Sequence, residues 1–188
     1  MIFRSLALFA LTATASADLV IDSALGTSLD VSHAVGSGDL TSYMVIDFGA
    51  TGGESVAFSY SWSGPTTPTS NDMIEAIVDE GFLSWEYTEF AGFGRAIDNF
   101  TYGDMTGDQS LFWGLSLGEV VDPGVSWEGS PVGISTNLLG NNSIDGWYNG
   151  FNEDFSTIPP VLPLVPAPGV LTALVLVGGS GRRRRHTH

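Results

Sequence analysis

The chain contains no cysteine and no lysine, and only six of its 188 residues are basic. Without cysteine, the protein cannot be a small disulfide-stapled domain, bind zinc through thiolates or use a cysteine nucleophile. Charged residues make up 14% of the chain, below the usual quarter, and hydrophobic residues make up 43%. The composition therefore argues against a disordered polyelectrolyte and predicts one globular domain with additional terminal segments.

The acidic residues are concentrated in the central part of the chain. All 21 of them lie between positions 18 and 165, where Arg95 is the one basic residue, so this region has a formal charge of −20. Nucleic-acid affinity depends on cations that neutralise phosphates, and this charge therefore predicts no nucleic-acid partner. An acidic surface of this kind suits a salty or calcium-containing extracellular medium.

The first 17 residues have the three parts of a secretory signal peptide. Arg4 provides a positive charge, residues 5–13 form an apolar run, and Ala15 and Ala17 are small residues at the peptidase positions. A buried or amphipathic first helix is disfavoured, because the run is short and acids follow it directly. The sequence predicts export, with signal peptidase as a partner and cleavage after Ala17.

Two segments with different properties follow position 157. Residues 158–168 contain five of the nine prolines, which predicts an extended, semi-rigid spacer. Residues 169–181 are apolar or small, and four consecutive arginines follow them. Positive charges beside an apolar segment stay on the cytoplasmic side of a membrane. Residues 169–188 are therefore predicted to be a short transmembrane helix with an arginine cluster.

This combination of a proline-flanked motif, a brief apolar segment and a terminal arginine cluster resembles the PEP-CTERM sorting signal of exported bacterial proteins. The residues that carry the resemblance are Val165, Pro166, Ala167, Pro168, Gly169, Arg182, Arg183, Arg184 and Arg185. Ala167 stands where the usual motif has glutamate. The resemblance implies processing by exosortase, a membrane-embedded cysteine transpeptidase, and association with the cell envelope and extracellular polysaccharide. A plain single-span membrane anchor is the alternative.

Residues 18–157 are predicted to form the acidic ectodomain, mainly from short strands. Strands are expected at 42–48 and 54–62, the second because large and small side chains alternate along it. The glycine-bearing residues 49–53 would join these strands as a hairpin. Further strands are expected at 82–90, 95–102, 111–116 and 125–128, with one or two more around Trp147.

One helix is expected between these strands. Ser70 or Asn71 would cap it, and it would end near Glu80. Its predicted buried stripe consists of Met73, Ile74, Ile77 and Val78. The predicted fold class is α+β, a mainly antiparallel sheet with one main helix packed on it, and an all-β sandwich is the alternative.

A G-x-S-x-G pattern spans residues 114–118, with Ser116 at its centre. A hydrolase nucleophile elbow needs a helix after this serine and a histidine base later in the chain. Pro123 and Gly124 follow soon after, and the domain's one histidine, His33, precedes the motif. A chance match in a glycine-rich chain explains the pattern better than a serine hydrolase does.

Metal binding would have to rely on oxygen ligands, because the domain has one histidine and no cysteine. Asp104 and Asp108 lie in a segment loosely similar to the start of a calcium-binding loop. Leu115 stands where such a loop needs its bidentate glutamate. We therefore expect no cofactor, with structural calcium at Asp104 and Asp108 as a weak alternative.

Five tryptophans stand out in a domain of this size. Trp62 and Trp85 are expected in the core, whereas Trp147 and Tyr148 follow a polar, glycine-bearing segment and are expected to be exposed and able to stack on a ligand. Asp145, Gly146 and Trp147 also form a late Asp-Gly-Trp sequence similar to one found in ectodomains that carry the same tail. That similarity implies no particular activity.

These features together predict an exported, non-enzymatic protein of the cell surface or extracellular matrix. It would be anchored in the membrane before exosortase processing, and extracellular polysaccharide is a possible partner. The alternative is a secreted carbohydrate-active protein, either a sugar-binding module or a glycoside hydrolase with a pair of carboxylates.

Overall fold

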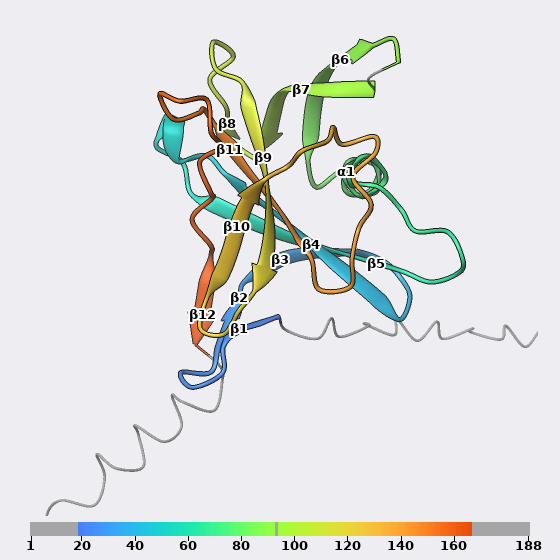
Figure 1. The fold of residues 1–188 in the computed structure, drawn as a ribbon, viewed down its shortest axis with the longest axis vertical. Coiled ribbons are helices and arrows are strands. Elements are labelled where there is room, and N and C mark those ends of the chain that lie inside the picture. The colour runs from blue at the N-terminus through green and yellow to red at the C-terminus, as the bar shows by residue number, and fades with distance from the viewer. Residues whose placement is uncertain (1–18, 93, 167–188) are drawn as a thin grey trace, which may run out of the picture.

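The computed structural model describes residues 19–92 and 94–166, and about half of these residues lie in β-strands (Figure 1). The elements, in chain order, are β1 (Val20–Asp22), β2 (Thr27–Leu29), β3 (Val31–Gly36), β4 (Leu40–Asp47), η1 (Gly49–Thr51), β5 (Ser55–Trp62), α1 (Ser70–Asp79), β6 (Ser84–Phe90), β7 (Gly94–Tyr102), β8 (Met105–Thr106), β9 (Trp113–Val120), β10 (Val125–Gly129), β11 (Ile144–Asn149) and β12 (Leu164–Pro166). The prediction of a sheet-dominated fold with one helix is confirmed for the described residues. No helix among them is long and apolar enough to cross a membrane.

A six-stranded sheet with the order β10-β9-β11-β4-β5-β3 forms the centre of the domain. The predicted β4–β5 hairpin is confirmed, since the two strands pair antiparallel from Leu40↔Trp62 to Asp47↔Ser55 around η1. Two other pairs, β3–β5 and β11–β4, are parallel. The sheet is therefore mixed. Each parallel pair joins two strands that are not consecutive in the chain, and local sequence patterns do not specify such pairs.

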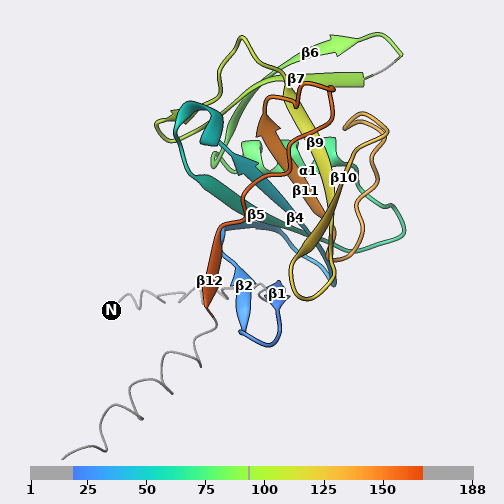
Figure 2. The same ribbon diagram turned by 60° about the vertical axis from the view of Figure 1, so that its left-hand side comes forward.

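Both faces of the central sheet are buried. Along β4, Met44 and Ile46 point to one face, and Tyr43 and Val45 point to the other, and all four are at most 2% exposed. The first face is covered by α1 and the β6-β7-β8 sheet, and the second by the small β1-β2-β12 sheet. Figures 1 and 2 show β1, β2 and β12 together at one end of the domain.

Helix α1 covers one edge of the first face. Its cap is Thr69, one residue earlier than predicted: the Thr69 side chain accepts a hydrogen bond from the Asp72 amide, and the Asp72 carboxylate accepts one from the Thr69 amide. Ser70 is buried instead and uses its hydroxyl elsewhere. Met73, Ile74 and Ile77 are fully buried as predicted, and Val78 is partly buried.

Candidate functional site

Residues 157–166, which we call the C-terminal strap, lie along the second face of the central sheet. The Ser116 hydroxyl donates to Thr157 Oγ1 (2.8 Å), and the Val161 amide donates to Asp47 Oδ2 (2.8 Å). The strap ends in β12, which pairs antiparallel with β2. The described part of the predicted spacer is therefore attached to the domain along its length.

Gly146 explains how the strap approaches β11 closely. A Cβ atom on Gly146 would lie 2.5 Å from Trp127 Cζ3 and 2.7 Å from Pro160 Cγ. Pro160 is buried, so it and the Trp127 ring occupy the space that any larger residue at position 146 would need. The glycine of the Asp-Gly-Trp sequence therefore has a packing role.

We expect Gly146→Ala to lower the free energy of unfolding by about 1–3 kcal/mol, because the added methyl group overpacks this contact. Urea denaturation of the two proteins measures the effect. Gly140→Ala is the matched control, since a Cβ atom there would meet only Ser143, at an ordinary 3.6 Å. Equal midpoints for the two variants would contradict the packing role.

An open hollow of about 460 Å³ lies beside the strap and falls within the usual size range of ligand pockets. We call it the aromatic hollow, because three of its lining residues are Trp127, Phe151 and Phe155. Its other lining residues are Ser116, Glu128, Gly129, Ser130, Ser156, Thr157 and Pro159. Phe155 is 86% exposed and Phe151 is 38% exposed. Strand β10, the loop after β11 and the strap together build this site.

A tight turn presents Phe155 to solvent. Phe155 has a left-handed backbone (φ 63°), which is unusual for a bulky residue. Its amide donates to the Asn152 carbonyl, and the Asn152 amide donates to the Ser156 carbonyl. Asp154 Oδ1 accepts hydrogen bonds from the Ser156 hydroxyl and amide, which lower the pKa of Asp154. The turn thus holds the phenyl ring outward against the cost of an unfavourable backbone conformation.

The G-x-S-x-G serine contributes to this hollow without being a nucleophile elbow. Ser116 lies within strand β9 and is fully buried, and its hydroxyl is engaged by Thr157. His33 is elsewhere, stacked on Phe82 (ring centroids 4.1 Å apart) and hydrogen-bonded through Nε2 to Tyr102 Oη (3.0 Å). The serine and the histidine therefore have different hydrogen-bond partners and are not paired with each other.

The prediction that Trp147 is exposed is wrong, since its side chain is 2% exposed. Strand β11 lies between β4 and β9, so Trp147 pairs with Ile46 on one side and Leu115 on the other, and its ring packs edge-on against Phe100. Tyr148 is partly buried and lines a separate hollow of about 550 Å³ with Asp47 and Glu54. The two side chains point to opposite faces, so they do not form one stacking surface.

Asp145 is buried on the same face as Trp147. Its carboxylate accepts hydrogen bonds from the Ser70 hydroxyl (2.5 Å) and from Asn137 Nδ2 (3.3 Å), which connects β11 to the start of α1. Burial raises the pKa of Asp145 to about 6, and the two hydrogen bonds offset part of this effect. Sequence patterns do not indicate this network, because Ser70 lies 75 positions from Asp145 in the chain.

The two weak calcium candidates do not form a cluster with other acids. Asp108 Oδ1 accepts hydrogen bonds from the Ser110 amide and hydroxyl, which lower the pKa of Asp108, and Asp104 is exposed. Within residues 19–92 and 94–166, no three acidic or histidine side chains are arranged to hold a metal ion.

Of the predicted sorting residues, Val165 and Pro166 are described and lie in β12, paired with Ser28 and Thr27. Ala167, Pro168, Gly169, Arg182, Arg183, Arg184 and Arg185 lie outside the described residues, as do Ala15 and Ala17 at the predicted signal peptidase site.

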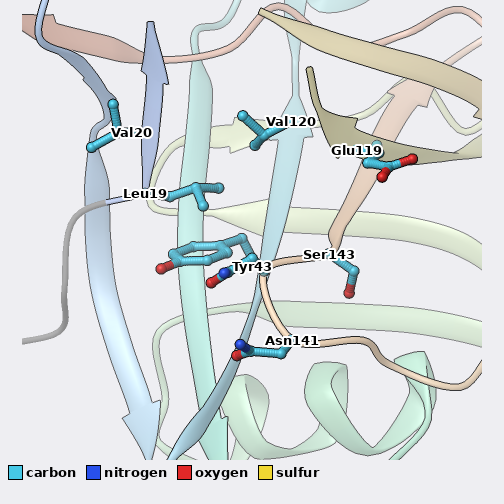
Figure 3. Close-up of a pocket in the computed structure, with 9 residues that line it drawn as sticks. Leu19, Val20, Tyr43, Glu119, Val120, Asn141 and Ser143 are labelled. Carbon is cyan, nitrogen blue, oxygen red and sulfur yellow. The ribbon is translucent and has the colours of Figure 1, made fainter. Parts of the chain in front are cut away.

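Figure 3 shows another hollow, of about 710 Å³, lined by Leu19, Val20, Tyr43 and Glu119 among others. Leu19 directly follows the predicted mature N-terminal residue.

Comparison with known proteins found no matching family model, no matching curated sequence and no matching solved structure.

Proposed function

We propose that this chain is an exported cell-envelope protein that a C-terminal, PEP-CTERM-like signal sorts, and that its ectodomain has a non-enzymatic role. The observation that supports this proposal most directly is the position of β12. It is the last described strand, it contains the first two residues of the sorting motif, and it shares a sheet with β1 and β2. The predicted membrane-directed segments at both termini would therefore leave the same end of the domain.

In this proposal, signal peptidase cleaves after Ala17, and the apolar segment at 169–181 holds the chain in the membrane with Arg182–Arg185 on the cytoplasmic side. Exosortase then cleaves near the Pro-Ala-Pro motif, and the acidic domain is released or attached outside the cell. Thr157, Pro160 and Val161 anchor the strap just before that motif. Processing would thus leave the folded domain intact.

A second candidate function is a sugar-binding module, and the aromatic hollow favours it. Exposed aromatic rings are suited to a ligand with an apolar face. The two functions are compatible, because sorting depends on the tail and binding depends on the domain.

We expect the mature native protein to begin at Asp18 and to end near the Pro-Ala-Pro motif, without the arginine cluster. Intact mass spectrometry of the protein from its native host measures both ends. Changing Pro166 and Pro168 to alanine should leave the protein in the membrane with its arginines, because the processing enzyme loses its motif.

Gly140→Ala is a suitable control variant, since the substitution meets only ordinary contacts and is far from the motif in sequence. It should be processed like the native protein. A native protein that retains Arg182–Arg185 would show that the tail is only an anchor, and the sorting proposal would then be abandoned.

A further inference from the structure

We propose that one end of the domain rests on the surface of the membrane that the C-terminal segment spans, and that the side chains of Leu25 and Val121 insert among the lipid headgroups there. We call this surface the β12 end and define it as residues 20–26, 121–124 and 164–166. The inference rests on the proposed membrane segment at 169–181, and it adds a partner for the folded domain, which is a lipid surface.

Direct contacts hold the three segments of the β12 end together. The Ser23 amide donates a hydrogen bond to Asp122 Oδ1 (2.9 Å), and the Gly124 amide donates one to the Ile21 carbonyl (2.9 Å). Strand β2 pairs with β1 on one side and with β12 on the other. Figures 1 and 2 show the β9–β10 turn beside these strands. The two turns and β12 therefore lie at the same end of the domain.

Exposed apolar side chains are concentrated at this end. It contains only 14 of the described residues, but it has five of the 15 large hydrophobic side chains that are exposed among them. Leu25 in the β1–β2 turn is 66% exposed, and Val121 in the β9–β10 turn is 55% exposed. The others are Val20, Leu164 and Val165. Such side chains lose unfavourable contact with water when they enter the interface of a bilayer.

The place where the described chain ends favours a membrane as the occupant of this surface. Strand β12 ends at Pro166, and the predicted membrane segment begins three positions later, at Gly169. A chain spans at most about 11 Å over three residues, whatever its conformation. Each headgroup layer of a bilayer is about 5–8 Å thick. If residues 169–181 cross the membrane, the end of β12 therefore lies at the headgroups or directly above them.

The strap limits how far the domain can move from that membrane. The Val161 amide donates to Asp47 Oδ2 (2.8 Å), and the Asp30 amide donates to the Pro163 carbonyl (2.8 Å). The pairing of β12 with β2 continues this attachment up to Pro166. The strap is thus not a free linker that could hold the domain away from the bilayer, and the two turns stay close to the lipid.

The charges of the β12 end select the kind of lipid surface. This end contains no basic residue, and its two acidic residues are Asp22 and Asp122. Asp122 accepts hydrogen bonds from the hydroxyl and the amide of Ser23, which lower the pKa of Asp122, so its carboxylate is ionised at neutral pH. Anionic headgroups would repel these charges. The expected partner is therefore a bilayer surface with zwitterionic headgroups.

Single-cysteine variants of the full chain test the inference, because the native sequence contains no cysteine. Val121→Cys and the control Phe112→Cys each receive a polarity-sensitive fluorescent label and are reconstituted in phosphatidylcholine vesicles that carry a nitroxide on some headgroups. Both native side chains are exposed, but they flank strand β9, whose eight residues separate them by about 26 Å. We expect the nitroxide to quench most of the fluorescence at position 121 and little at position 112. Equal quenching at both positions, or none at position 121, would overturn the inference.

A second pair of variants tests the contribution of Leu25. Leu25→Asp, made in the chain labelled at position 121, should remove much of the quenching, because a carboxylate is unfavourable among lipids. Leu138→Asp is the matched control, since Leu138 is 64% exposed but forms a bridge with Thr69, outside the β12 end. It should leave the quenching unchanged. Equal effects of the two substitutions would contradict the insertion of Leu25.

Flotation of the same vesicles separates this inference from the proposed function. If the chain floats with the vesicles but shows no quenching at position 121, the membrane segment is present and only the inference fails. If the chain does not float, the proposed membrane segment fails, and the inference that depends on it fails as well.

Discussion

Replacing Trp147 with alanine is expected to lower the free energy of unfolding by about 3–5 kcal/mol. The indole is 2% exposed and lies between Phe100, Leu115 and the β4 side of the core. Its loss leaves a large cavity that the surrounding strands, which are hydrogen-bonded on both sides of β11, cannot close. Urea or thermal denaturation measures the change.

The matched comparison is Phe155→Ala, which removes an aromatic ring that is 86% exposed. That substitution should change the unfolding free energy by no more than about 0.5 kcal/mol. If Trp147→Ala were equally mild, the indole would be a surface residue and the arrangement of β11 described above would be wrong.

The stability of the protein is expected to fall as the pH rises from about 4 to about 6, through the ionisation of Asp145. Its pKa is raised from 3.8 in the unfolded chain to about 6 in the fold, mainly because of burial. The folded state therefore binds the proton more tightly than the unfolded state does. The contribution is complete below about pH 3.8 and is lost as the pH passes 6. A shift of about two pKa units corresponds to about 3 kcal/mol.

Asp145→Asn should remove most of this pH dependence, because the amide has the same size and carries no charge. Urea denaturation at pH 4, 5, 6 and 7 provides the measurement. Asp108→Asn is the control, since the pKa of Asp108 is lowered by Ser110 and the group titrates below this range. A pH profile that is the same in Asp145→Asn and in the native protein would contradict the assignment.

Local patterns predicted the elements that depend on neighbours in sequence. The alternation of large and small residues along 54–62 indicated β5, the glycines at 49–53 indicated its turn, and the stripe of Met73, Ile74 and Ile77 indicated α1. These elements form because side-chain periodicity and turn residues act within a few positions. The same reasoning missed β12 and the parallel pairs, which depend on distant segments.

The candidate site was less predictable than the fold. The sequence did not predict a functional role for Phe155, although the polar residues beside it, Asp154 and Ser156, are typical of a turn. Its exposure depends on a left-handed backbone, and the hollow beside it needs β10, β9 and the strap to meet. No spacing of residues in the sequence indicates that β9, β10 and the strap pack together.

By itself, the sequence determined the acidic charge of the domain and the absence of thiol chemistry, because these follow from composition. It also predicted the signal peptide and the sorting tail, because such predictions need only short contiguous segments. Only the tertiary structure decided the separate structural roles of the three residues in the Asp-Gly-Trp sequence. Asp145 accepts a hydrogen bond from Ser70, which is 75 positions away in the chain. Gly146 allows Pro160 of the strap to approach closely, and Trp147 lies on a strand that is paired on both sides. The burial of a side chain depends on which residues pack against it in the assembled sheet. Its neighbours in the sequence do not determine those residues.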